Sequence, residues 1–187
     1  IWWLAFLRHH RPALVGFVLV TFVLGTALLG PLLLPYGTSE AFERFIEPSG
    51  AHWLGTDSQG YDLLTRMVRG AQVTLAIALA SMSLSLISGT AAGALAGFLG
   101  GWVDNVIMRL VDFAMSFPSF LLAMVTVAVL GAELKNVILA VGFVGAPLFA
   151  RQIRAEVLRV KAQEYIVAAE ALGLSRRRIL LRHVLPN

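Results

Sequence analysis

Long runs of apolar residues, separated by short polar segments, dominate this chain of 187 residues. The first run, residues 13–34, carries no charged side chain and is long enough to cross a bilayer, which takes about 20 residues of α-helix. Three further runs, at about residues 71–99, 105–130 and 136–150, are also predominantly apolar. The pattern therefore predicts an all-α membrane protein, a polytopic bundle with four transmembrane helices.

Two polar segments separate or follow these runs, and their charges differ in sign. Residues 36–70 carry five acidic and three basic side chains, whereas residues 151–187 carry eight basic and three acidic ones. Because Lys and Arg collect on cytoplasmic flanks, we expect residues 151–187 inside the cell, together with Arg8 and Arg11 before the first run. The acidic segment then lies outside, and four crossings satisfy both assignments.

These assignments divide the chain into four parts. They are a cytoplasmic flank with the first transmembrane helix (1–35), an extracytoplasmic segment (36–70), transmembrane helices two to four (71–150) and a cytoplasmic segment (151–187).

Composition supports a lipid environment and argues against an enzyme. The chain is 58% hydrophobic and 14% charged, whereas soluble domains are about 45–50% apolar and about 25% charged. Cysteine is absent and the four histidines have no ligand spacing, so we expect no disulfide, metal or cofactor site. No G-x-S-x-G, H-E-x-x-H or G-x-x-x-x-G-K-[ST] pattern occurs, and so neither hydrolase chemistry nor ATP binding by a phosphate loop is expected.

Small residues recur at steps of four along the second apolar run. They are Ser81, Ser85, Gly89, Gly93 and Gly97. Because lipid provides no hydrophobic drive between helices, such a stripe lets another helix approach until the backbones touch. We interpret the five residues as a helix-packing face and expect a bulky residue at Gly93 to disturb assembly with a second membrane subunit.

The third run contains charged residues and a proline. Arg109 and Asp112 are three residues apart on one side of a helix, which predicts a mutually compensating pair near the membrane interface. Pro118, and Pro147 in the fourth run, predict kinks because proline lacks an amide donor and its ring clashes with the preceding turn.

The chain closes with a predicted pair of short helices, AAEALGLSRRRILLRHVLPN. The first helix, residues 164–172, stops at Gly173, which can adopt the left-handed conformation of a helix end. Ser175 is a natural N-cap for the second helix, whose apolar stripe is Ile179, Leu180, Val184 and Leu185. Two interpretations remain open: a membrane-anchored helix-turn-helix that binds DNA, or an element whose apolar face docks into a groove of a cytoplasmic partner.

The closing segment resembles the coupling loop of bacterial ABC importer permeases, whose pattern is E-A-A, three residues, G, a basic helix and L-P. The stretches HWLGTDSQGYDLLTRMVRGA, GGWVDNVIMRLVDFAMSFPSFLLA and NVILAV are similar, in the same order, to the second permease subunit of oligopeptide, dipeptide and nickel importers. The resemblance implies a multi-pass subunit of the bacterial inner membrane that transports peptides and hydrolyses no ATP itself. It implies four kinds of partner: a homologous permease, cytoplasmic ATPases, an extracytoplasmic solute-binding protein and membrane lipid, but no nucleic acid.

Position by position, the resemblance also implies which residues contact the ATPase. They are Glu164, Ala168, Ala169, Glu170, Gly173, Ser175, Arg178, Leu185 and Pro186. Val167 stands where the family usually has glutamate. Family members continue with further spans after this loop, so we expect two more helices after Asn187.

Overall fold

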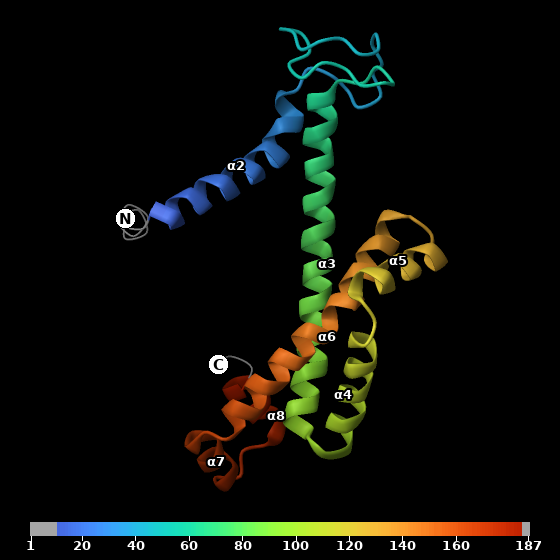
Figure 1. The fold of residues 1–187 in the computed structure, drawn as a ribbon. Helices are drawn as coiled ribbons and strands as arrows, with labels where there is room; N and C mark the ends of the chain where they lie inside the picture. The colour runs from blue at the N-terminus through green and yellow to red at the C-terminus, as the bar shows by residue number, and fades with distance from the viewer. Residues whose placement is uncertain (1–10, 185–187) are drawn as a thin grey trace. The chain divides into compact units, whose positions relative to one another are not determined.

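The structure is a computed structural model that describes residues 11–184, except for the side chains of Glu170, Arg176, Arg177 and Leu181. Every regular element in this part of the chain is a helix, as predicted (Figure 1). The elements are α2 (Arg11–Leu33), α3 (Leu63–Leu99), α4 (Gly101–Met115), α5 (Ser119–Leu130), α6 (Leu134–Lys161), α7 (Glu164–Ala171), α8 (Arg176–Ile179) and the π-helix η1 (Leu180–Val184).

Three helices are long and apolar enough to cross a membrane, namely α2, α3 and α6. The pair α4 and α5 passes the same test when joined, although the two helices meet at a bend of 89°. Many large apolar side chains on these helices are exposed, Phe22 and Phe120 among them. Exposed apolar side chains on helices of this length are what a lipid environment requires.

The chain divides into two compact units, Ile1–Ala76 and Ile77–Asn187. In the first unit, α2 is followed by an irregular cap, residues 34–62, which contains two isolated β-bridges, Ala41 to Tyr61 and Thr56 to Asp62. Buried polar side chains organise this cap, with His52, Thr56 and Asp62 each less than a tenth exposed.

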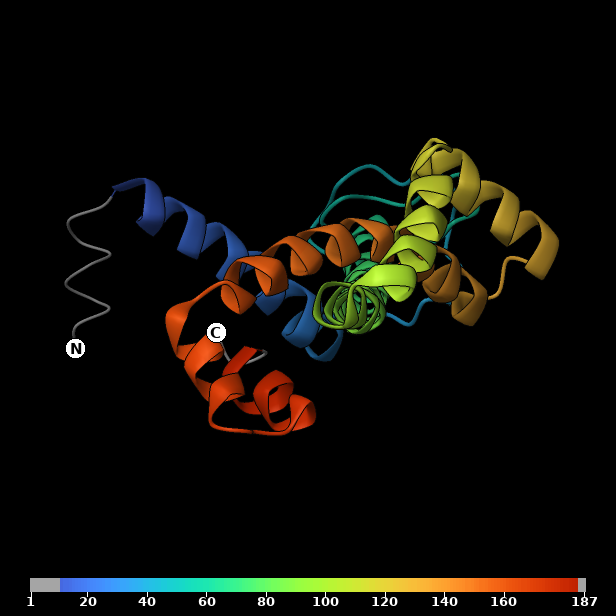
Figure 2. The ribbon, with the colours of Figure 1, turned by 90° about the horizontal axis from the view of Figure 1, so that it is seen from below.

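The second unit contains the rest of α3 and all later helices. Figures 1 and 2 show α4 alongside the second half of α3, and α6 crossing it. The core of this unit lies where α3 and α6 end, and it includes Phe98, Val157 and Val160.

Three helix boundaries differ from those predicted by hydropathy. Helix α3 begins at Leu63 rather than near residue 71, because the Asp62 carboxylate accepts the Thr65 amide and caps a polar first turn. The third predicted span is broken between Met115 and Ser119, a larger change of direction than a kink. Helix α6 runs on to Lys161, beyond the apolar run that predicted it.

Candidate functional site

The segment 164–184, hereafter the knob, consists of α7, α8 and η1 and follows α6 after a break at residues 162–163. Helix α7 ends as predicted, because Gly173 has φ 78°. The Leu174 amide donates to the Ala169 carbonyl at 3.1 Å, the bond of a Schellman C-cap. Ser175 then directly precedes α8, and its carbonyl accepts the Ile179 amide at 3.0 Å.

The inner face of the knob packs on the ends of α3 and α6. Ile166 and Ile179 are at most 1% exposed, and Val184 is also buried. They share one apolar cluster with Phe98 of α3 and Val157 of α6. Ile179 and Val184 of the predicted apolar stripe are therefore covered by their own chain. The expectation that this stripe docks into a partner is wrong for Ile179 and Val184.

The outer face of the knob is also apolar but uncovered. Leu172 is 80% exposed and Val167 58% exposed, and Tyr165 and Ala168 beside them are exposed as well. Exposed apolar side chains grouped on a polar, basic segment mark an interaction surface. The outer face is thus the part of the knob that the described chain leaves exposed.

The predicted coupling residues fall on both faces of the knob. Glu164, Ala168, Ser175 and Arg178 are exposed, whereas Ala169 is buried. Leu185, Pro186 and the side chain of Glu170 lie outside what the structure describes, so their predicted roles stay predictions.

The stripe of small residues on α3 lies against α6 of the same chain. The Ser85 hydroxyl donates to the Gly142 carbonyl at 2.7 Å, and Ser81 donates to Ile138 at 3.4 Å. A Cβ atom added at Gly89 would lie 2.5 Å from the Ala146 carbonyl oxygen. The stripe thus packs within one chain, and the expectation that it meets a second membrane subunit is corrected.

The two helices keep a constant register along this contact. Each residue of the stripe faces the residue 57 positions later, as Ser85 faces Gly142, so the partner positions also advance by four. Helices α3 and α6 therefore run in the same direction. The chain between the end of α3 and the start of α6 must therefore cross back to the side from which α3 came. A broken span makes such a crossing, whereas a re-entrant loop returns to the side from which it entered.

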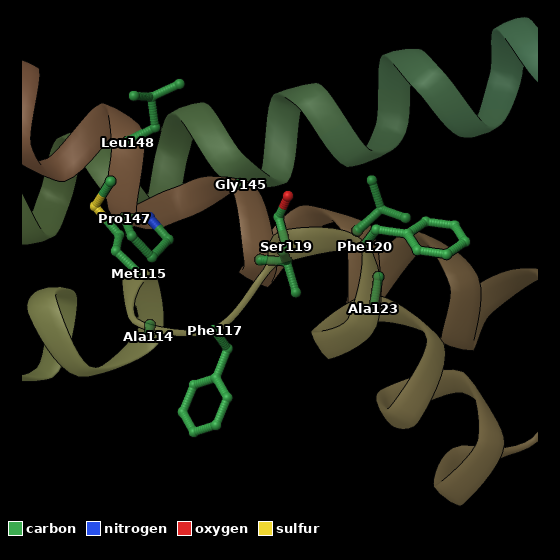
Figure 3. A pocket seen from close by; sticks show the side chains of 11 residues that line it. Ala114, Met115, Phe117, Ser119, Phe120, Ala123, Gly145, Pro147 and Leu148 are labelled. Carbon is green, nitrogen blue, oxygen red and sulfur yellow. The ribbon is translucent and has the colours of Figure 1, made fainter.

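The bend between α4 and α5, hereafter the elbow, borders a hollow of about 690 Å³ against α6 (Figure 3). Pro118 at the bend has no amide proton, and it restricts the backbone of the residue before it. The hollow is mostly apolar. Its walls include Met115, Phe117, Ser119, Phe120, Ala123, Gly145, Pro147 and Leu148.

The elbow lies near the middle of the apolar layer. The α6 residues that line the hollow span 141–148, and the register sets Gly142 of this range beside Ser85 of α3, at the centre of the run 71–99. Helix ends leave backbone groups without helical partners. At this depth such groups are tolerated only against protein or water, so the elbow belongs to a face that does not meet lipid.

Ion pairs connect α6 to its neighbours. Arg151 Nη2 lies 2.7 Å from Asp112 Oδ1, so Asp112 pairs with α6 rather than with Arg109 as predicted. Arg154 binds Asp104 at the start of α4 through two nitrogens. Lys161 Nζ donates to the Phe98 carbonyl at 2.9 Å, where the last carbonyls of α3 lack helical partners.

In the first unit, a buried pair of polar side chains lies in the cap directly before α3 begins. His52 Nδ1 lies 3.0 Å from Asp62 Oδ1, and the His52 ring stacks on Tyr36 at a centroid distance of 4.9 Å. Burial would raise the pKa of Asp62, but hydrogen bonds from the Thr65 amide and from His52 outweigh it and hold the pKa below its ordinary value. Sequence reasoning missed this pair, although an Asp directly before a helical pattern is a recognised N-cap signal.

No group of three or more His, Asp or Glu side chains that could hold a metal ion occurs in the part of the chain that the structure describes. The candidate functional site that the described residues form consists of the knob's outer face and the elbow.

Comparison with known proteins agrees with this architecture. Residues 89–187 match the family of binding-protein-dependent transport system inner membrane components, and the chain belongs to this family. Residues 1–48 match the N-terminal transmembrane domain of oligopeptide transport permease C. The chain is thus an inner-membrane protein of the second permease type, and the resemblance found in the sequence is confirmed.

Particular relatives are similar over nearly the whole chain. The dipeptide transport system permease protein DppC of Alkalihalophilus pseudofirmus is 38% identical over 97% of this chain and 60% of its own length. The glutathione transport system permease protein GsiD of Pectobacterium atrosepticum is 38% identical over 99% and 62%. The oligopeptide transport system permease protein OppC of Bacillus subtilis is 33% identical over 96% and 60%. The chain thus spans about three-fifths of the length of these relatives.

Proposed function

We propose that this chain is the transmembrane permease subunit of an ATP-driven, binding-protein-dependent importer whose cargo is short peptides. The family and the names of the relatives, which refer to dipeptides, glutathione and oligopeptides, support this function. The subunit forms part of the translocation pathway together with a homologous permease. ATP hydrolysis takes place on separate cytoplasmic subunits, and an extracytoplasmic binding protein delivers the peptide.

The observation that carries the proposal is the two-sided knob. Its inner face is fixed to α3 and α6 through Ile166 and Ile179, while its outer face exposes Val167 and Leu172. A rigid projection with an exposed apolar surface suits an element that a soluble partner binds and displaces. We infer that the outer face docks into a groove of the ATPase, and that the coupling residues Glu164, Ala168, Glu170, Leu185 and Pro186 belong to that contact.

The orientation follows from charge. The basic segment 151–187 lies in the cytoplasm and the acidic segment 36–70 outside, where it faces the solute-binding protein. Arginines on the knob suit a cytoplasmic flank, and Glu43 and Glu47 are exposed on the cap.

A DNA-binding regulator is the rival function, and the knob's geometry favours the importer. Helix α8 and the π-helix η1 that directly follows it together span Arg176–Val184, and Ile179 and Val184 on this segment are buried in their own chain. A recognition helix has to enter the major groove with free side chains along its length. A short helical segment packed along one side against α3 and α6 is poorly suited to that role.

Cysteine cross-linking in the complete transporter tests this function. We expect Leu172→Cys to cross-link to the ATPase subunit through a short bifunctional thiol reagent, because Leu172 is 80% exposed on the knob. Ser49→Cys on the cap is the control: it should give no such product and should react with a membrane-impermeant thiol reagent in intact cells. Absence of the Leu172 product, or labelling of both cysteines from outside, would exclude the proposed docking.

A further inference from the structure

Two ion pairs join α4 to α6 on the side of the bundle near the knob. Arg154 Nη2 lies 2.6 Å from Asp104 Oδ2, and Arg154 Nε lies 2.5 Å from Asp104 Oδ1. Arg151 Nη2 lies 2.7 Å from Asp112 Oδ1. We call these four residues the α4–α6 clamp. The two helices run in opposite directions through it, because the later residue of α6 meets the earlier residue of α4.

The Arg154 pair has the geometry of a strong interaction. A guanidinium fork that meets both oxygens of a carboxylate fixes orientation as well as distance. The side chains of Arg154 and Asp104 are 33% and 16% exposed, so solvent screens this pair less than the exposed Arg151 pair. The Arg154 pair is therefore the stronger constraint on the position of α4.

Apolar packing between these helices is incomplete. A hollow of about 290 Å³ lies among α3, α4 and α6, and it is bordered by Ile107, Val111 and Ala150. Close-packed side chains resist relative movement, whereas a hollow permits it. The ion pairs therefore constrain the register of α4 against α6 in a region where side-chain packing leaves a hollow.

The clamp also lies between the knob and the elbow along a single continuous helix. Val157 and Val160 of α6 pack in the knob's core, Arg151 and Arg154 come next, and residues 141–148 line the elbow hollow. On the other side, α4 leads from Asp104 to the elbow at its end. The ion pairs at this level give a displacement of α6 a direct side-chain route to the start of α4.

We propose that the α4–α6 clamp transmits displacement of the knob to the elbow, so that Asp104, Asp112, Arg151 and Arg154 are positioning residues for coupled transport. This inference rests on the proposed importer function. It separates two steps: the knob receives the movement from the ATPase, and the clamp passes it on to the broken span. Loss of the clamp should therefore leave ATP hydrolysis running without transport.

The test uses the complete transporter in proteoliposomes, with ATP hydrolysis and uptake of labelled di- to pentapeptides measured on the same samples. Arg154→Asp and Asp104→Arg should each lower uptake per ATP hydrolysed by about tenfold, within the range typical of coupling between sites. The double variant with both changes restores an ion pair with the charges exchanged, and it should recover most of the ratio. Arg154→Gln and Asp104→Asn serve as neutral variants if charge reversal prevents assembly.

Lys135→Asp is the matched control, because it reverses a charge on the same helix in an exposed pair with Glu133 that joins no second helix. Its ratio of uptake to hydrolysis should equal that of the unmodified complex. An unchanged ratio in all Arg154 and Asp104 variants, or uptake and hydrolysis that fall in proportion, would overturn the clamp's role in transmission. An unmodified complex without ATP-dependent uptake would instead contradict the proposed importer function.

Discussion

At the scale of single residues, Gly173 and Ile179 shape the knob in different ways: Gly173 ends α7 in the left-handed conformation, and Ile179 holds α8 against the core. Gly173 was expected to end a helix in the left-handed conformation, and its φ of 78° confirms this. Ile179 was expected to face a partner, but it is fully buried in its own chain. A glycine's conformation depends on the few residues around it. An apolar stripe indicates that a surface covers it, but not whether that surface belongs to the same chain or to a partner. The identity of the covering surface requires the tertiary structure.

Asp62 supplies a prediction at the residue scale. Asp62→Ala should destabilise the start of α3 by about 1 kcal/mol, because the side-chain oxygen that caps the helix is lost. Hydrogen exchange at the Thr65 amide, which donates to Asp62 at 2.8 Å, should become faster at pH 7. Glu47→Gln, an exposed acid of the same cap, is the control and should leave this exchange unchanged.

The same carboxylate predicts a pH dependence. The pKa of Asp62 in the folded protein lies below its ordinary value of 3.8, so its contribution to stability is complete above pH 3.8 and is lost as the pH falls through the lower, folded-state pKa. Thr65 protection, corrected for the intrinsic exchange rate, should therefore decline below about pH 4 in the unmodified protein only. An equal decline in Asp62→Ala would show that another group is responsible.

At the scale of helices, the sequence predicted a packing face but not its partner. Small residues at steps of four indicated that another helix approaches α3 closely. The partner also carried a signal, because Gly142, Ala146 and Ala150 of α6 are small and equally spaced. Matching the two stripes would have predicted their contact. The 89° elbow was not predictable from Pro118 alone, since a proline in a transmembrane helix is compatible with a slight kink as well as a break.

Gly93→Ala tests the helix contact. The added Cβ would lie closer than 3.0 Å to the Ala150 carbonyl oxygen, which belongs to the α6 backbone and cannot rotate away. Overpacking of this kind costs about 1–3 kcal/mol, more than the gain of about 1 kcal/mol from replacing a helical glycine. The unfolding midpoint of the purified protein in detergent should therefore fall.

The matched control is Gly16→Ala in α2, where an added Cβ meets nothing within 4 Å. This variant should keep or slightly raise the midpoint, since alanine favours the helix. An unchanged midpoint in Gly93→Ala would mean that α3 and α6 are less closely packed than described.

At the scale of the whole molecule, hydropathy predicted an all-α membrane protein and the family resemblance implied the inner membrane. The family match confirms both. The sequence also predicted that the third run crosses the membrane once, with a kink at Pro118. The common direction of α3 and α6 supports this crossing, because their contact keeps one register from Ser81 to Gly97. The chain must cross back between them, and the elbow is the break in that crossing.

The central claim is that the knob couples this subunit to an ATPase, and Gly173 tests it most directly. Gly173→Val strains a backbone with φ 78° although the space around it is open, because a β-branched residue is strongly disfavoured in this conformation. Gly173→Asn is the matched control, since asparagine tolerates the left-handed conformation. The measurement is peptide-stimulated ATP hydrolysis together with uptake in the complete transporter. We predict that both fall together in Gly173→Val while the subunit still inserts, and that both largely persist in Gly173→Asn. Unimpaired hydrolysis and uptake in Gly173→Val would contradict the account.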